Sequence, residues 1–177
     1  SHGNYTGLFN AEWGAGFANV SPVPDYVDQI PNSEGLLPND RTHLFKFSGA
    51  YRSGIGLNVG ASFIWQSGTP ITELGRNGPL HPIFLSPRGT AGRTPAFVDL
   101  NLRFKYDLGK FIVGGFHSML VMDIFNVLNQ RKAATVNQTH YFGVDANSNP
   151  ILPNPDYLRP LRFYPERNVR LGMQIEF

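Results

Sequence analysis

The sequence predicts an all-β chain that forms about five C-terminal strands of a larger antiparallel transmembrane β-barrel, with long extracellular loops. Three observations predict this fold class. Five segments of about ten residues alternate apolar and polar side chains, long and short links alternate between them, and the chain ends in an amphipathic strand with an aromatic last residue. Alternation with a period of two places the two sets of side chains on opposite faces of a strand.

The five predicted strands cover residues about 43–52, 56–66, 97–106, 117–126 and 168–177. The third separates its side chains most cleanly, whereas the fourth has a mixed polar face, so its register is the least defined. Strands of about ten residues, tilted by about 45°, cross an apolar band of about 25 Å. Strands of soluble proteins average about five or six residues. The strand lengths therefore favour a membrane barrel.

The links predict how the barrel is oriented. Residues 53–56 and 107–116 make short links, while about 7–42, 67–95 and 129–166 are long and rich in Gly, Pro and Asn. Outer-membrane barrels have short periplasmic turns and long outer loops. We therefore expect a periplasmic C-terminus and extracellular long loops in a bacterial outer membrane.

The whole chain, 1–177, is predicted to be the C-terminal part of one barrel domain. The smallest barrels have about eight strands, so five strands cannot close one. The first residue is not Met, and we expect the sequence to begin inside a longer protein, with the missing strands upstream or in other chains.

Composition and motifs exclude several other classes. The net charge is +2, and the eleven arginines among fifteen basic residues are spread along the chain, which gives no support to nucleic-acid binding. Cysteine is absent, so disulfides and thiolate metal sites are excluded. No catalytic or phosphate-binding motif occurs, and we expect neither an enzyme nor a cofactor or metal. The segment 145–156 matches a calcium loop only in part, and a plain polar loop is favoured.

Six segments, placed at strand ends, together resemble the C-terminal third of TonB-dependent receptors, in the Oar-like branch that carries a carboxypeptidase-regulatory-like domain. They are residues 37–43, 66–70, 87–95, 98–100, 123–129 and 170–177. The resemblance implies a 22-stranded barrel with a plug in its lumen, driven by the TonB, ExbB and ExbD complex.

The resemblance implies uptake of a large or scarce solute, such as a siderophore, an oligosaccharide or a peptide. One alternative is an Oar-like structural, adhesion or export-related protein whose loops bind surface lipoproteins or other envelope proteins. Another is a soluble β-sandwich lectin. For a receptor that takes up a solute, the implied partners are outer-membrane lipid and lipopolysaccharide, the rest of the barrel and plug, and the barrel assembly machinery.

Three groups of candidate site residues follow from these patterns. Four terminal residues resemble the signal that the assembly machinery recognises, against the alternative of an ordinary edge strand: Leu171, Met173, Ile175 and Phe177. Four others are predicted to face the lumen, more as a solvated or plug-contacting wall than as a solute track: Asp99, Asn101, Arg103 and Lys105. Candidate binding residues of the outer loops are Tyr141, Phe142, Tyr157 and Arg159.

Two structural roles are also predicted. Asn126 is expected to hydrogen-bond the backbone where the fourth strand enters its loop. Aromatic residues near strand ends are expected to form girdles at the lipid headgroups, against the alternative of a soluble core. They are Phe63, Trp65, Phe104, Tyr106, Phe125 and Phe177.

Overall fold

A computed structural model describes residues 4–5, 29–78, 82–109, 117–147 and 149–176. The chain divides into two compact units. The sheet unit consists of Leu44–Gln66, Ala96–Lys132 and Tyr164–Phe177, and the loop unit of Ser1–His43, Ser67–Pro95 and Ala133–Phe163. Among the described residues, no helix is long and apolar enough to cross a bilayer.

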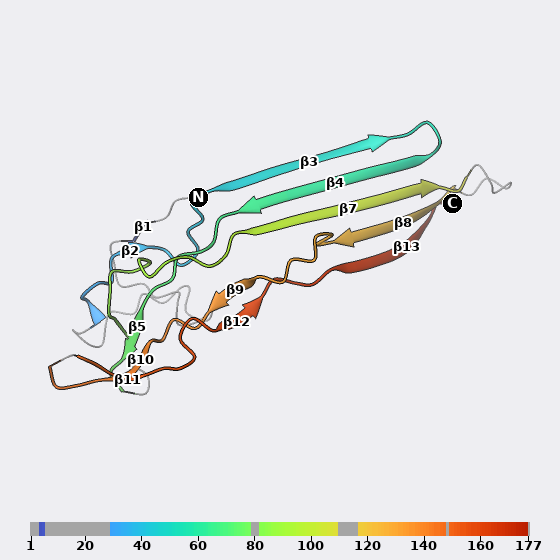
Figure 1. The fold of residues 1–177 in the computed structure, drawn as a ribbon. Coiled ribbons are helices and arrows are strands. Elements are labelled where there is room, and N and C mark those ends of the chain that lie inside the picture. The colour runs from blue at the N-terminus through green and yellow to red at the C-terminus, as the bar shows by residue number, and fades with distance from the viewer. Residues whose placement is uncertain (1–3, 6–28, 79–81, 110–116, 148, 177) are drawn as a thin grey trace. The chain divides into compact units, whose positions relative to one another are not determined.

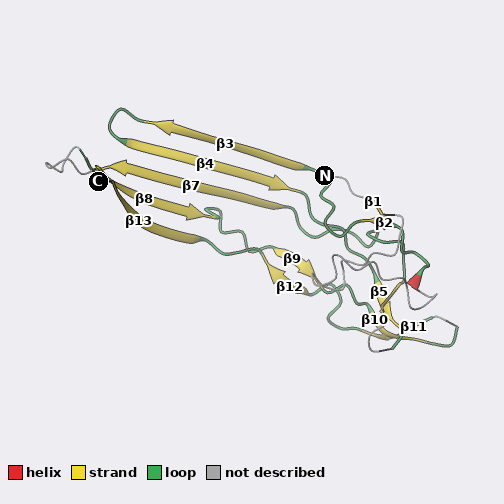
Figure 2. Ribbon diagram, turned by 180° about the vertical axis from the view of Figure 1, so that it is seen from behind, coloured by secondary structure: helices red, strands yellow, loops and turns green. Residues whose placement is uncertain are grey.

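The sheet unit confirms the predicted all-β fold class, because it is one antiparallel sheet that is open at both edges. Its five strands lie side by side in both views (Figures 1 and 2), in the order β13-β8-β7-β4-β3. The strands are nine to eleven residues long: β3 Leu44–Arg52, β4 Leu57–Gln66, β7 Phe97–Asp107, β8 His117–Phe125 and β13 Asn168–Glu176.

The pairing register keeps apolar and polar side chains on separate faces. Residues directly opposite each other in an antiparallel pair share a face, so each row across the sheet has one character. Phe47 lies opposite Phe63, which lies opposite Leu100. Pairing of Leu102 with Ile124 settles the face of β8, whose register the sequence left least defined. Its Leu120, Met122 and Ile124 therefore belong to the apolar face.

Large apolar side chains on the edge strands of this sheet are exposed. Phe47 is 63% exposed, Tyr51 71% and Leu171 70%. A water-soluble sheet buries such a face, since a contiguous apolar surface in water is costly. An apolar face that is regular along every strand and open at the edge strands matches the lipid-facing wall of a membrane barrel.

The three long segments contain short paired strands, whereas the sequence pattern predicted loops without strands. Four small antiparallel pairs form: β1, which precedes the first long segment, pairs with β2, and β5 pairs with β6, β9 with β12, and β10 with β11. Their bounds are β1 Asn4–Tyr5, β2 Gly35–Leu36, β5 Leu74–Arg76, β6 Pro82–Phe84, β9 Ala133–Val136, β10 Tyr141–Val144, β11 Pro150–Pro153 and β12 Pro160–Phe163. Buried backbone groups need partners, and these pairs supply them.

The loop unit has a small apolar core of its own. Ile71, Leu74, Ile83 and Phe84 are each at most 7% exposed. Backbone hydrogen bonds join distant segments around this core, with the Leu74 N–H donating to the Gln138 carbonyl at 3.0 Å and the His140 N–H donating to the Leu74 carbonyl at 2.7 Å. The long segments are therefore one packed body.

Candidate functional site

The polar face of the sheet carries the four residues predicted to face the lumen. Asp99, Asn101, Arg103 and Lys105 alternate along β7 and share one face. Arg103 lies opposite Asp123 of β8, which lies opposite Arg170 of β13. One cross-strand row thus brings together three charged residues from distant parts of the chain.

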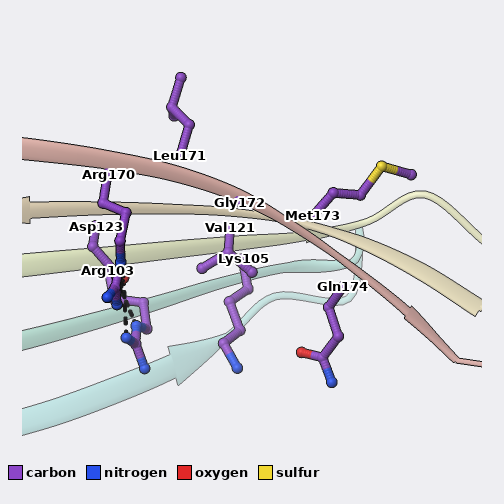
Figure 3. Close-up of a pocket in the computed structure, with 9 residues that line it drawn as sticks. All are labelled: Arg103, Lys105, Val121, Asp123, Arg170, Leu171, Gly172, Met173 and Gln174. Carbon is purple, nitrogen blue, oxygen red and sulfur yellow. Dashed lines mark hydrogen bonds and ion pairs between the residues drawn. The ribbon is translucent and has the colours of Figure 1, made fainter.

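Asp123 is held between the two guanidinium groups. Arg103 Nε donates to Asp123 Oδ1 at 2.5 Å, and its terminal nitrogen donates to Oδ2 at 3.1 Å. Arg170 donates to Oδ2 from a terminal nitrogen at 2.7 Å and from Nε at 3.2 Å (Figure 3). The Asp123 side chain is only 4% exposed, whereas those of Arg103 and Arg170 are 51% and 64% exposed. Two cations on one carboxylate leave a positive charge facing solvent.

A groove of about 310 Å³ lies beside this cluster, along β7, β8 and β13. Figure 3 shows Lys105 and Gln174 pointing to the same side of the sheet as Arg103, and Leu171 pointing to the other side. Within the described part of the chain, Lys105 makes no hydrogen bond or ion pair with another side chain. Gly172 leaves the groove open, because a Cβ built there would meet no atom within 4 Å.

Asp99 and Asn101 are instead tied into the wall. Asn101 Nδ2 donates to Asp99 at 2.9 Å, and the Asn126 N–H donates to Asn101 Oδ1 at 2.9 Å. The Asn126 side chain donates to the Pro165 carbonyl at 2.7 Å. Asn126 therefore bonds the backbone at the end of β8, as the sequence predicted. Of the four predicted lumen residues, only Arg103 and Lys105 line the groove.

Two of the four predicted loop residues come together around a histidine. The His140 ring stacks on Tyr157 with centroids 4.0 Å apart and lies 4.2 Å from the ring of Tyr141. His140 Nδ1 contacts a Glu73 carboxylate oxygen at 2.5 Å. Burial raises the pKa of the Tyr157 hydroxyl, and the nearby Glu73 charge raises it further. This cluster joins β5 to β10 and stabilises the loop unit.

The other two predicted loop residues lie outside this cluster. Phe142 points to the opposite face of β10 from Tyr141 and lies 5.8 Å from the Arg76 guanidinium. Arg159 forms an exposed ion pair with Asp156 at 2.7 Å. The four predicted loop residues therefore do not form one cluster, because Tyr141 and Tyr157 pack against His140 whereas Phe142 and Arg159 are exposed elsewhere.

The tip of the β10–β11 hairpin is a polar turn. The Asp145 carboxylate accepts hydrogen bonds from the backbone of Asn147 and from the side chain and backbone of Asn149. Hydrogen bonds from Asn149, first from its side chain, lower the pKa of Asp145. Among the described residues, no group of three acidic or histidine side chains is placed to hold a metal.

Three of the sequence motifs meet inside the loop unit. Arg93 ion-pairs with the buried Asp40 carboxylate at 2.8 Å and donates to the Gly68 carbonyl at 2.8 Å. The Thr94 N–H donates to the Thr69 carbonyl at 2.9 Å, and Thr94 Oγ1 accepts from the Thr69 N–H at 2.9 Å. The motifs at 37–43, 66–70 and 87–95 therefore form one structural junction.

The predicted assembly signal lies along the edge strand β13. Leu171, Met173 and Ile175 are exposed on its apolar face, and Phe177 lies outside the described residues. One girdle prediction is wrong: Phe125 shares the face of Asp123, and the Arg170 guanidinium lies 5.7 Å from its ring centroid. The Phe125 side chain pairs with a cation on the polar face instead of facing lipid.

Sequence reasoning did not identify Arg170, Asp40, Arg93 or His140 as site residues. Arg170 belongs to a visible polar face, but only the register between β8 and β13 brings it to Asp123. The ion pair of Asp40 and Arg93 could have been suspected from the sequence, because these oppositely charged residues lie in two of the quoted motifs, which flank different strands.

Comparisons with known proteins show what this chain is similar to. No family model matches the chain, and no solved structure matches it. The chain is 36% identical over 147 residues to the TonB-dependent transporter Oar of Myxococcus xanthus. This match covers 78% of the chain but only 14% of that relative's length. The Oar-like resemblance seen in the motifs is confirmed, and over these residues the chain is an Oar-like relative of the TonB-dependent receptors.

Proposed function

We propose that this chain is part of a TonB-dependent outer-membrane receptor that takes up a large or scarce solute, such as a siderophore, an oligosaccharide or a peptide. The amphipathic five-stranded sheet carries this proposal, because its exposed apolar face and charged polar face fit the wall of a membrane barrel. The relationship to Oar supports an outer-membrane transporter and points away from an enzyme.

The proposed orientation places the C-terminus in the periplasm and the loop unit outside the cell. Antiparallel pairing puts the turn between β3 and β4, the β7–β8 link and the C-terminal end of β13 at one end of the sheet. The three long segments all leave from the other end. Long loops on the outer side are the usual arrangement of such barrels.

The proposed partners follow from this location. They are outer-membrane lipid and lipopolysaccharide around the apolar face, the rest of the barrel and plug along the polar face, the TonB, ExbB and ExbD complex as the energy source, and the barrel assembly machinery during biogenesis. The relationship to a TonB-dependent transporter supports the TonB system and the outer membrane as context.

Two measurements on the full-length parent protein test the proposal. The parent is expected to fractionate with the outer membrane and to migrate faster on a detergent gel before heating than after it. A deletion strain is expected to lose growth on one solute class when siderophores, cobalamin, oligosaccharides and peptides are supplied in turn as the limiting nutrient. The intact gene restores growth, and a gene lacking the TonB-interacting segment does not. A soluble parent protein contradicts the proposal.

A second candidate function is adhesion or export through an Oar-like surface protein that binds surface lipoproteins or other envelope proteins. Exposed apolar side chains on the short strands of the loop unit favour it, since such patches mark protein contacts. Leu152 and Leu161 are each 63% exposed, and Phe163 is 48% exposed. This function predicts a stable partner in the purified complex, and no nutrient phenotype in the deletion strain.

A further inference from the structure

The β5–β6 hairpin of the loop unit carries the only Asn-Gly pair in the sequence. Asn77 and Gly78 follow the last paired position of the hairpin, where Arg76 lies opposite Pro82. Both residues are exposed, and Gly78 has a φ of 89°. Glycine adopts this backbone conformation without strain, so an Asn-Gly pair is typical of a tight turn. The same turn places a backbone nitrogen next to a side-chain amide.

This arrangement allows a reaction within the chain. The Gly78 backbone nitrogen attacks the side-chain carbonyl carbon of Asn77, and a new C–N bond closes a cyclic succinimide. The bond from that carbon to the side-chain nitrogen breaks, and ammonia leaves with the proton that the Gly78 nitrogen loses. Water then opens the ring at either of its carbonyl carbons, which leaves aspartate or isoaspartate at position 77. Water is the sole co-reactant, so an exposed turn supplies everything that the reaction needs.

The backbone nitrogen of Gly78 is accessible for this attack. Its N–H donates no hydrogen bond to any residue that the structure describes. A Cβ built on Gly78 would meet no atom within 4 Å, so neighbouring groups leave the backbone room to turn toward the Asn77 side chain. Glycine also has no side chain of its own to hinder ring closure. These features favour the reaction at this position.

Asn32, in the same loop unit, shows the opposite arrangement. It also precedes a small residue, Ser33, but its side-chain nitrogen donates to the Phe84 carbonyl at 3.2 Å. The Ser33 N–H donates to the Ile30 carbonyl at 3.2 Å, and Ser33 is 3% exposed. Ring closure at Asn32 would therefore break two hydrogen bonds, one of them in a buried place, which is costly.

A change at Asn77 would alter the charge beside a predicted loop-binding residue. Arg76 precedes Asn77, and its guanidinium lies 5.8 Å from the ring centroid of Phe142. Arg76 has no carboxylate partner among the described residues. A carboxylate at position 77 would place a negative charge next to this cation.

We propose that Asn77 is a modification site at which the folded protein deamidates spontaneously. The product is aspartate or isoaspartate, and its carboxylate offsets the charge of Arg76 beside Phe142. The inference goes beyond the proposed function and does not depend on it, because it needs only the exposed hairpin and water. The loop unit thus changes its surface charge with time, without an enzyme.

Incubation of the purified full-length protein in heavy-oxygen water at neutral pH tests this proposal. Mass spectrometry of peptides is expected to find heavy oxygen at residue 77, as a mixture of aspartate and isoaspartate. Isoelectric focusing is expected to show a more acidic band that grows with time. The rate should rise with pH, because a base must remove the proton from the Gly78 nitrogen. Asn32 should keep its amide over the same period.

The Ser33→Gly variant separates the effect of the fold from that of the sequence. It creates a second Asn-Gly pair, at residues 32 and 33, while the Asn32 side chain keeps its hydrogen bond to Phe84. In the folded variant, Asn32 is expected to convert several-fold more slowly than Asn77. After unfolding in urea, the two residues should convert at similar rates.

A second pair of variants identifies the residue that produces the acidic band. Asn77→Gln is expected to abolish this band, because the longer side chain closes its ring far more slowly. Asn149→Gln is the matched control, since Asn149 is also exposed but precedes Pro150, whose nitrogen carries no proton to lose. This control should leave the band unchanged.

Three outcomes overturn the inference. The first is an Asn77 that stays intact in the folded protein but converts in the chain unfolded in urea, because the fold would then protect it. The second is equal conversion of Asn32 and Asn77 in folded Ser33→Gly, because the hydrogen bonds would then have no influence. The third is a residue 77 that contains no heavy oxygen after incubation, because the ring would then not have been opened by the added water.

Discussion

Gly68 lies at the junction of motifs in the loop unit, where its backbone approaches that of Thr94. A Cβ built on Gly68 would clash with the Thr94 carbonyl oxygen. That oxygen belongs to the backbone and cannot rotate away, so a larger residue must displace one of the two segments. The glycine in this motif is therefore explained by the close approach of two backbone segments of the chain.

Gly68→Ala is expected to destabilise the loop unit by about 1–3 kcal/mol, because the added methyl group overpacks the junction. Limited proteolysis of the folded parent protein measures this effect as faster cleavage in the loop unit. Gly54→Ala is the control, since nothing lies within 4 Å of its Cβ, and it should change stability by less than about 0.5 kcal/mol. Equal cleavage rates for the two variants would contradict the explanation.

Asp40 and Arg93 give a second prediction at this junction. Arg93→Gln is expected to cost about 2 kcal/mol, since it removes a charged hydrogen bond to the buried Asp40 carboxylate. Asp40→Asn in the same molecule removes the buried charge and should recover part of the loss. A double-mutant cycle on loop-unit unfolding measures the coupling. Additive effects would show that the two residues act independently.

Within a single strand, neighbouring residues lie on opposite faces of the sheet. In the proposed barrel one residue therefore faces lipid and the next faces the water-accessible lumen. Met173 lies on the apolar face of β13 and is 57% exposed, while its neighbour Gln174 points to the polar face. Both belong to the same edge strand, so they differ mainly in the face that they present. This pair therefore offers a matched comparison.

Met173→Lys is expected to lower barrel stability by up to about 2–4 kcal/mol, the cost of a cation facing lipid near the bilayer midplane. Gln174→Lys should cost far less, because it adds a cation to a water-accessible face. Urea unfolding of the parent protein in lipid vesicles measures both. If the two lysines are equally tolerated, the apolar face does not contact lipid.

Two exposed sites, one in the loop unit and one in the β3–β4 turn of the sheet unit, test which side of the membrane each unit faces. An epitope inserted at the exposed Asn77–Gly78 turn of the loop unit should bind antibody on intact cells. The same epitope inserted between Ser53 and Gly54 should bind only after the outer membrane is permeabilised. Flow cytometry measures both, and the reverse labelling pattern would place the C-terminus outside the cell.

At the scale of the whole molecule, the fold class could be predicted from the sequence. A sheet with one apolar and one polar face requires apolar and polar residues to alternate along each strand, and this alternation is visible within a short segment. The pairing between strands is not local, so the ion cluster of Arg103, Asp123 and Arg170 required the register. The short strands of the loop unit escaped detection because two to four residues show no clear period. Prolines at Pro82, Pro150 and Pro160 also favour turns over strands.

The terminal aromatic residue gives a prediction for assembly of the whole barrel. Phe177→Ala is expected to lower the amount of folded parent protein in the outer membrane several-fold, because Phe177 belongs to the predicted signal through which strand addition would capture this strand. The heat-modifiable fraction of outer membranes measures it. Phe142→Ala, an exposed aromatic of the loop unit, is the control and should leave that amount unchanged. An equal loss of folded protein in both variants would contradict the role of Phe177 in the assembly signal.

The shared core of the loop unit limits which substitutions each of the three long segments can accept. Leu74 bonds the backbone at Gln138 and His140, and Leu36 bonds Arg88, so each long segment supplies part of the support for another. A substitution accepted in one segment therefore depends on the residues present in the others. Transplanting one segment into a related receptor should fail to fold where transplanting all three succeeds. The three long segments are therefore expected to be exchangeable between receptors only as a set.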